Sequence, residues 1–232
     1  FSYDYPLAPE ATLSEINETI FKIYCSFAEE YYKDNFKEVF LFGRSAGAYL
    51  CLVLAKRISN YNTLPTPKGI IDFYGYYDLK STFLKEPSPY YNTFGKVQDT
   101  ILESFSIKDK SADNNTKALR YSLYVYARQN GSLLDIWRTK EEDLEVYSLT
   151  EKDFDLLPPL FITASSGDKD VPMSQSKNLF RKHQKSYARW VYYLDHDFDR
   201  NINDETGKNV YIECINWINN LIKKDSNYPL EI

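Results

Sequence analysis

The chain has 232 residues and a mass of 27.2 kDa, which is enough for one α/β domain with an insert. Its formal net charge is −5 and it has no run of basic residues, which argues against nucleic acid as a partner. The sequence has no stretch of 18 apolar residues, so it predicts no membrane span.

Helical and extended patterns alternate along the first third of the chain. Two prolines in residues 4–10 prevent a helix there and favour an extended turn. Thr12 and Glu15 have the spacing of a capping box, and apolar residues then recur at three- and four-residue steps. This pattern predicts a helix over 13–31 with one face packed on a sheet. The next predicted elements are a strand over 38–42, a helix over 48–57 and a strand over 68–75.

The alternation breaks between residues 78 and 157, which are polar, rich in aromatic residues and helical in patches. Helices are predicted over 93–105 and 116–129, the second ending near Gly131 as its C′ residue. Residues 108–115 have the composition of an exposed loop.

Strand and helix patterns return in the last third of the chain. The predicted elements are a strand over 159–164, a helix over 173–185, a strand over 189–194 and a helix over 205–223. Because strands and helices alternate, we expect an α/β fold with a mainly parallel, doubly wound sheet.

The most informative segment is Gly43-Arg44-Ser45-Ala46-Gly47, which reads G-x-S-x-G between a predicted strand and a predicted helix. This context is typical of a nucleophile elbow, with Ser45 at the tip of a sharp turn. We expect a Cβ at either glycine to collide with the neighbouring strand or helix. The backbone N–H of Ala46, at the start of the helix, can then face a developing oxyanion.

With this elbow, Asp4-Tyr5-Pro6-Leu7-Ala8-Pro9-Glu10 resembles the D-Y-R-L-A-P-E segment of the hormone-sensitive-lipase-like esterases, members of the α/β-hydrolase superfamily. The resemblance implies that residues 1–77 and 158–232 form the hydrolase core. It implies that residues 78–157 form a helical lid between the sixth and seventh strands of the family's sheet.

Two features depart from the family pattern. The family elbow commonly reads G-D-S-A-G, whereas this chain has Arg44 at the second position. The family's first three strands and its H-G-G oxyanion loop have no counterpart in the sequence. A fragment of a longer polypeptide is favoured over a protein without that loop, because a sheet lacking three strands would expose a long hydrophobic edge.

A serine hydroxyl needs a base to take its proton, and histidine is the usual one. His183 lies near a helix end in a charged stretch, where interaction with the helix dipole is enough to explain it. His196 follows the last predicted strand, where parallel sheets place their sites, and its H-x-F sequence resembles the family's histidine loop. We therefore assign His196 as the base.

The acid is expected on the loop after the preceding strand, where Asp168 and Asp170 compete. Asp168 is favoured because it stands at the D-x-x-V-P spacing of related hydrolases. Asp170 is the alternative acid, although it could instead cap the helix that begins near Pro172. The acid's role is to hold the imidazole in the correct tautomer.

Two further residues are candidates for substrate binding. Arg44, beside the nucleophile, could bind a substrate carboxylate, but an ion pair with an acid of the fold is the favoured reading. Tyr76 belongs to a chain unusually rich in tyrosine, with 21 residues of this type. Most of these rings are expected in the core with their hydroxyls in water.

The cysteines and the missing motifs restrict the remaining possibilities. Cys25, Cys51 and Cys214 lack C-x-x-C spacing, which favours buried thiols and a cytoplasmic location. The sequence contains no P-loop, G-x-G-x-x-G or metal-ligand cluster, so we expect neither a cofactor nor a metal ion.

The predicted function is that of a serine carboxylesterase or lipase-like hydrolase. It would cleave small or medium carboxylic esters through a Ser-His-Asp triad and an acyl-enzyme. The expected partner is a small-molecule ester, and a homodimer is allowed. Two alternatives stay open: a peptidase or amidase of the same fold, because the triad does not separate esters from amides, and a non-catalytic binding protein that keeps the fold.

Overall fold

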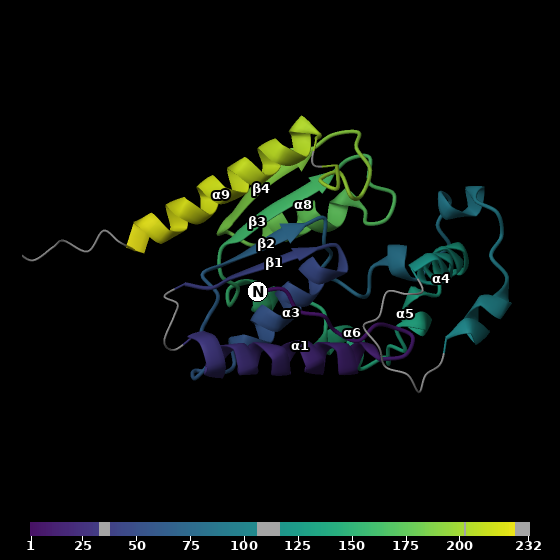
Figure 1. Ribbon diagram of the computed structural model, residues 1–232, viewed down its shortest axis with the longest axis horizontal. Helices are drawn as coiled ribbons and strands as arrows, with labels where there is room; N and C mark the ends of the chain where they lie inside the picture. Colours follow the sequence, from purple (N-terminus) through teal and green to yellow (C-terminus); the bar gives the residue numbers. More distant parts are fainter. Residues whose placement is uncertain (33–37, 106–116, 202, 226–232) are drawn as a thin grey trace, which may run out of the picture. The chain divides into compact units, whose positions relative to one another are not determined.

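The computed structural model describes residues 1–32, 38–105, 117–201 and 203–225, and the chain divides into two compact units. The first unit contains Phe1–Phe27 and Asp78–Ser148, and the second contains Ala28–Tyr77 and Leu149–Ile232. Each unit has its own secondary structure (Figure 1).

The second unit is built on a sheet of four parallel strands. They are β1 (Phe40–Arg44), β2 (Gly69–Phe73), β3 (Leu160–Ser165) and β4 (Ser186–Val191), hydrogen-bonded in the order β1-β2-β3-β4. Parallel neighbours need crossover connections, and this sheet obtains them from helices. The predicted α/β class with a mainly parallel sheet is therefore confirmed.

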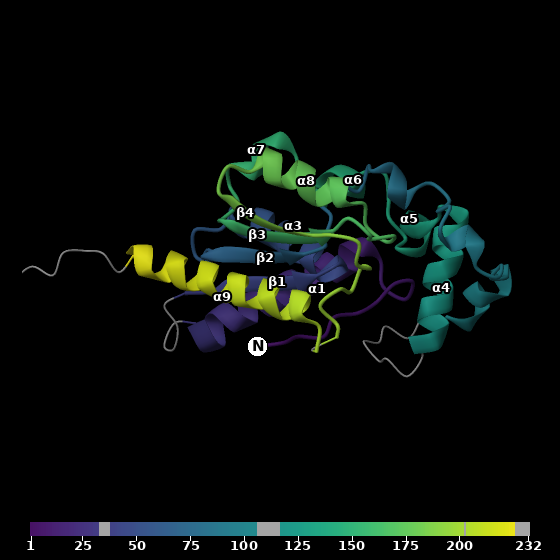
Figure 2. The same cartoon turned by 90° about the horizontal axis from the view of Figure 1, so that it is seen from above.

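Helices cover both faces of this sheet, as a doubly wound fold requires. α3 (Ala46–Ile58) contacts β1 and β2, and α8 (Met173–Lys182) contacts β3 and β4. α9 (Glu205–Asp225) packs through Val210 and Cys214 on the opposite face, so α8 and α9 lie on opposite sides of the sheet (Figure 2). Strands covered on both faces are mostly apolar, and β2 and β3 are buried at every position, including the polar residues Asp72, Thr163 and Ser165.

Smaller elements complete the second unit. The α-helix of the first unit continues into it as the π-helical segment η1 (Ala28–Tyr32). A short helix, α7 (Glu151–Phe154), precedes β3 and begins with a capping box formed by Thr150 and Asp153.

The first unit is mostly helical. Its elements are α1 (Leu13–Phe27), α4 (Lys117–Asn130), α5 (Leu133–Ile136), α6 (Asp143–Val146) and the 3-10 turns η2 (Thr82–Leu84), η3 (Tyr91–Thr93) and η4 (Asp99–Ser104). The predicted capping box is present, because the Thr12 N–H donates to the Glu15 carboxylate at 2.9 Å. The buried carboxylate of Glu10 accepts two hydrogen bonds from Arg120 on α4, at 2.6 and 3.1 Å.

The predicted helix over 93–105 is wrong. The structure has the 3-10 turns η3 and η4 instead, separated by an extended segment. Gly95 disfavours a helix at this point. The side-chain amide of Gln129 donates to the carbonyl of Gly95 at 3.1 Å and thereby satisfies a backbone acceptor that a helix would have used.

The last strand and two helix ends also differ from the prediction. β4 is three residues earlier than the predicted 189–194, because Tyr193 has a φ of +63° and cannot continue an extended strand. α8 ends at Lys182 rather than at 185, and the α-helix α1 ends at Phe27 rather than at 31. The predicted loop over 108–115 lies outside the described residues.

Among the residues that the structure describes, every helix is too short or too polar to cross a bilayer. Burial raises the pKa of the Cys51 thiol to about 12 and that of the Cys214 thiol to about 11, so the expectation of buried thiols holds for these two, whereas Cys25 is half-buried. The role of residues 78–157 as a lid stays a prediction.

Candidate active site

Ser45 lies at a sharp turn between β1 and α3. Its φ of +53° and ψ of −121° are unusual for a residue with a side chain, and such backbone strain is typical of a nucleophile elbow. The Ser45 N–H donates to the carbonyl of Phe73 at 2.8 Å, which anchors the turn to the end of β2. The hydroxyl is therefore presented at the carboxyl edge of the sheet, where parallel sheets place their sites.

The two glycines of the elbow are not equivalent. A Cβ built on Gly43 would lie 2.2 Å from the carbonyl carbon of Gly47, so only glycine fits there. The expected collision at Gly47 is wrong, because a Cβ built on that residue meets no described heavy atom within 4 Å apart from its chain neighbours and the nearby backbone of its own helix. The close approach of β1 to α3 therefore requires a glycine on the strand, at Gly43, and not on the helix, at Gly47.

Ser45, His196 and Asp168 form a continuous hydrogen-bonded chain. His196 Nε2 lies 2.8 Å from Ser45 Oγ, and His196 Nδ1 lies 2.7 Å from Asp168 Oδ2. With the proton on Nδ1, the ring donates to Asp168 and accepts from the serine hydroxyl. In this tautomer Nε2 is unprotonated and faces the hydroxyl, so the imidazole can take the serine proton.

The carboxylate of Asp168 is held on both oxygens. Oδ2 faces His196, while Oδ1 accepts the backbone N–H groups of Asp170 and Val171 at 2.8 and 2.9 Å. The structure therefore places Asp168 in hydrogen-bond contact with the imidazole, while a carboxylate oxygen of Asp170 lies within 4.8 Å of the same group. The expected helix cap by Asp170 is wrong, because the N-cap residue of α8 is Pro172.

Asp168, Asp170 and His196 are also the residues that could hold a cation. Their ligand atoms lie within 4.8 Å of one another. Nδ1 of His196 is already hydrogen-bonded to Asp168, so a cation bound there would have to replace the proton between them. The expectation that the protein uses no metal ion stays a prediction.

Ser165, the last residue of β3, joins the loop that carries the acid to the loop that carries the base through two hydrogen bonds. Its buried hydroxyl donates to the carbonyl of Leu194 at 2.5 Å and accepts the N–H of the same residue at 3.1 Å. Gly167 completes the contact, since a Cβ there would lie 2.5 Å from the carbonyl oxygen of Leu194. Sequence reasoning missed Ser165, and only its place at a strand end could have suggested it.

The environment of His196 sets its proton affinity. Burial lowers the pKa of the imidazole, but the hydrogen bond to Asp168 and the charges of Asp168, Asp170 and Asp197 outweigh it. The pKa of His196 is therefore raised above its ordinary value of 6.5. A raised pKa makes the imidazole a better proton acceptor but keeps it protonated to a higher pH.

Ala46 and His183 occupy different settings. Ala46 is the first residue of α3, so its N–H belongs to the first helical turn, which has no acceptor within the helix.

His183 is buried at the end of α8, with Nδ1 2.8 Å from Ser186 Oγ. Burial lowers the pKa of His183, and the interaction of its ring with the helix dipole stays a prediction.

The guanidinium of Arg44 pairs with an acid of the fold. Its Nη2 donates to Asp199 Oδ1 at 3.0 Å and its Nε donates to the Tyr74 hydroxyl at 2.5 Å. The reading of Arg44 as a structural partner was favoured from the sequence, but neither Asp199 nor Tyr74 was identified. No local pattern marks a residue so distant in the chain as a partner.

Tyr76 is buried, and its ring stacks on that of Tyr49 with centroids 4.8 Å apart. The ring of Tyr76 is therefore part of the hydrophobic core, as expected for most of the tyrosines. Its role in binding substrate stays a prediction.

A buried carboxyl lies beneath the start of α3. Asp72 on β2 is fully buried and accepts the N–H of Gly75 at 2.8 Å. Within the described residues its other oxygen, Oδ2, has no hydrogen-bond partner. Burial raises the pKa of Asp72 to about 7, although the hydrogen bond from Gly75 opposes the shift.

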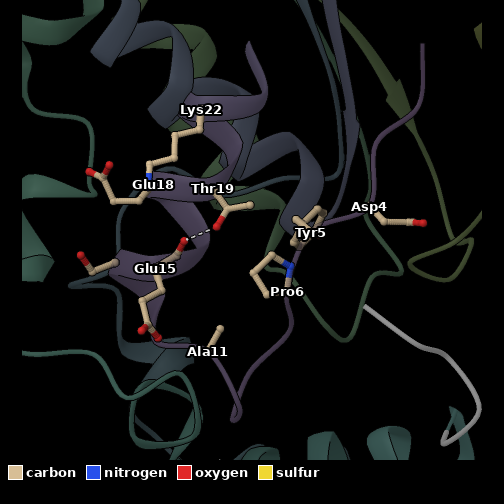
Figure 3. Close-up of a pocket in the computed structure, with 9 residues that line it drawn as sticks. Asp4, Tyr5, Pro6, Ala11, Glu15, Glu18, Thr19 and Lys22 are labelled. Carbon is tan, nitrogen blue, oxygen red and sulfur yellow. Dashed lines mark hydrogen bonds between the residues drawn. The ribbon is translucent and has the colours of Figure 1, made fainter. Parts of the chain in front are cut away.

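The first unit has a pocket of about 650 Å³ (Figure 3). Its walls come from the N-terminal segment, including Asp4, Tyr5 and Pro6, and from one side of α1, including Glu15 and Glu18. The lining residues all belong to the first unit, whereas Ser45, Asp168 and His196 all belong to the second.

Comparison with known proteins gives a family and a fold. A family model of the alpha/beta hydrolase fold matches residues 1–192. A crystal structure of an alpha/beta hydrolase superfamily protein from Enterococcus faecalis is 31% identical, with a TM-score of 0.79 over 92% of this chain and 76% of that one. A Staphylococcus aureus protein with unknown function is 28% identical, with a TM-score of 0.81 over 94% of this chain and 76% of that one.

More distant structures share the fold. An esterase from Rhizomucor miehei is 17% identical, with a TM-score of 0.61 over 95% of this chain and 64% of that one. At this identity the likeness shows the fold alone. No curated protein sequence matches the chain.

Proposed function

Because the chain belongs to the alpha/beta hydrolase superfamily, we propose that it is a serine hydrolase that cleaves small or medium carboxylic esters. The observation that carries this proposal is the hydrogen-bonded chain from Asp168 through His196 to Ser45, with distances of 2.7 and 2.8 Å. The Rhizomucor miehei esterase shows that this fold can carry ester hydrolysis, which makes an ester the proposed substrate class.

In the first half of the proposed reaction, Ser45 Oγ attacks the carbonyl carbon of the ester while its proton passes to His196 Nε2. Asp168 holds the other side of the ring and stabilises the imidazolium. The N–H of Ala46 donates to the oxyanion of the tetrahedral intermediate. His196 then protonates the leaving alkoxide, the carbon–oxygen bond breaks, and an acyl-enzyme remains on Ser45.

In the second half, water attacks the acyl carbonyl and gives one proton to His196 Nε2. The second tetrahedral intermediate collapses, the bond to Ser45 Oγ breaks, and the serine recovers its proton from the imidazolium. The products are one carboxylic acid and one alcohol, and the enzyme is unchanged. The proton transfer between Ser45 and His196 follows a hydrogen bond of 2.8 Å that already joins the two side chains.

A fluorophosphonate probe and two chromogenic esters test this proposal. We expect a covalent adduct on Ser45 by mass spectrometry and turnover of 4-nitrophenyl acetate and butyrate. Ser45→Ala and His196→Ala should each lower kcat by on the order of 10⁴-fold or more, because triad residues act as a unit. Ser59→Ala, which removes a hydroxyl that donates to the carbonyl of Lys56, is the matched control and should keep full activity.

Two outcomes would overturn the proposal. Failure of the probe to label Ser45 in the folded protein would favour a non-catalytic binding protein. Faster turnover of a 4-nitroanilide than of the 4-nitrophenyl ester with the same acyl group would favour an amidase.

A further inference from the structure

Asp199 is a buried carboxylate that gathers three donors from three different elements. Its side chain is only 1% exposed. Oδ1 accepts the Tyr74 hydroxyl at 2.6 Å and Arg44 Nη2 at 3.0 Å, and Oδ2 accepts the Tyr211 hydroxyl at 2.6 Å. A charge removed from water in this way is stable only when its oxygens are fully paired.

The ionisation states of these groups agree with the geometry. Burial raises the pKa of Asp199. The hydrogen bonds from Tyr211 and Tyr74 and the charge of Arg44 lower it by more, so the pKa of Asp199 ends below its ordinary value. Burial and the bond to Asp199 raise the pKa of both phenols. Asp199 is therefore a carboxylate that accepts from protonated tyrosines and from a guanidinium.

This cluster touches the proposed triad at two points. Asp199 lies three residues after His196 in the loop that follows β4, and Arg44 is bonded through the backbone to Ser45. The ring of Tyr74 also packs against the imidazole of His196, with centroids 4.6 Å apart. The elbow and the histidine loop are thus tied by an ion pair and by a ring contact.

We propose that Arg44, Tyr74 and Asp199 are positioning residues that hold the histidine loop against the nucleophile elbow, and so fix the distance between Ser45 and His196. This inference rests on the proposed serine hydrolase function. A displacement of about 1 Å between reacting groups can cost on the order of 100-fold in rate, so such an anchor matters for catalysis.

The backbone of Tyr74 supports a dedicated role for this residue. It has a φ of +47°, which is rare for an aromatic residue, and its side chain is fully buried. This conformation turns the chain directly after β2, where the ring meets His196 on one side and Phe198 on another, at 5.5 Å between centroids. Strain of this kind persists only where the surroundings determine it, which points to a functional constraint.

Arg44 as a binder of a substrate carboxylate is the competing explanation. Its Nε and Nη2 atoms are already bonded to Tyr74 and Asp199, and its side chain is 39% exposed. A positioning residue affects kcat for every ester. A carboxylate binder affects KM, and only for esters that carry a carboxylate.

The test compares Arg44→Met, Tyr74→Phe and Asp199→Asn in the 232-residue chain with two substrates, neutral 4-nitrophenyl butyrate and the anionic mono-4-nitrophenyl ester of glutaric acid. Each substitution preserves the approximate shape of the side chain and removes a charge or a hydroxyl. We expect kcat to fall by about 10- to 100-fold for both esters, with little change in KM. The rate of Ser45 labelling by the fluorophosphonate should fall in parallel.

A double-mutant cycle and a matched control sharpen this test. The double variant Arg44→Met/Asp199→Asn should be little worse than Asp199→Asn alone, because both changes break the same pair. Tyr187→Phe is the control, since it removes a tyrosine–carboxylate hydrogen bond of 3.1 Å to Glu213 on the surface of the same unit. It should keep full activity.

The outcomes separate the two proposals. If the wild-type chain is labelled and turns over while the three variants keep kcat within about twofold, the positioning proposal is wrong and the hydrolase proposal stands. A rise in KM for the anionic ester alone would identify Arg44 as a substrate ligand instead. If the wild-type chain is not labelled, the hydrolase proposal fails and the positioning role falls with it.

Discussion

Gly43 and Gly47 bracket the candidate nucleophile, but only Gly43 is required to be glycine. A Cβ on Gly43 would lie 2.2 Å from the carbonyl carbon of Gly47, whereas a Cβ on Gly47 meets no described heavy atom within 4 Å apart from its chain neighbours and the nearby backbone of its own helix. Neither glycine adopts a positive φ; the residue between them that does is Ser45, at +53°. The geometry of the elbow therefore requires glycine before the serine, at position 43, but not after it, at position 47.

Alanine at each position tests this asymmetry. Gly43→Ala should destabilise the protein by at least about 2 kcal/mol, because the backbone of β1 or α3 must shift to admit the methyl group. Gly47→Ala should be neutral or stabilising by up to about 1 kcal/mol, since alanine favours a helix over glycine. Urea unfolding followed by circular dichroism measures both. Equal losses of stability would show that Gly47 is also sterically required.

Asparagine substitutions at Asp168 and Asp170 distinguish the two candidate acids. Asp168→Asn should lower kcat by on the order of 10⁴-fold, because an amide that must still accept two backbone N–H groups presents its NH₂ to His196 and favours the wrong tautomer. Asp170→Asn should retain most of the activity, because the backbone N–H that Asp170 donates to Asp168 Oδ1 survives the substitution and Asp168 Oδ2 still faces His196. A larger loss in Asp170→Asn than in Asp168→Asn would reverse the assignment.

The pH dependence of activity should follow the raised pKa of His196. The base must be deprotonated, so kcat/KM should rise with pH and reach half its plateau above pH 6.5. Asp197→Asn removes one of the charges that favour the imidazolium, and should move the midpoint to lower pH. Asp155→Asn, which exchanges an exposed carboxylate, is the control and should leave the midpoint unchanged. A midpoint below 6.5 in the wild type would contradict this account.

Asp72 should make the protein less stable as the pH rises. Its pKa is about 7 in the folded state against 3.8 ordinarily, so between these values the unfolded chain releases a proton that the folded chain retains. The free energy of unfolding should therefore decrease from about pH 4 to pH 7, by at most on the order of 4 kcal/mol. Asp72→Asn should abolish this contribution and raise stability at pH 8.

The Asp72 prediction is checked by urea unfolding at several pH values. Asp99→Asn, at an exposed position, should keep the wild-type slope of stability against pH. An Asp72→Asn variant with that same slope would mean that the carboxyl ionises normally in the folded protein.

The sequence by itself determined the fold class and predicted the nucleophile and the base of the candidate triad. The elbow is a local feature, because Gly43 and Ser45 lie within one turn and the strand and helix patterns adjoin them. The order of Ser45, acid and His196 along the chain is likewise visible without coordinates. Parallel strands bring their carboxyl ends to one edge, so residues after successive strands could be expected to meet.

The tertiary structure decided what depends on residues far apart in the chain. Arg44 and Asp199 are separated by 155 positions, and no periodicity or motif links them. The preference for Asp168 over Asp170 at His196 follows from the turn that its own Oδ1 stabilises. The absence of steric pressure at Gly47 likewise depends on where the surrounding chain passes. Such pairings arise from packing, because contact energies act through space and a sequence pattern reports only near neighbours.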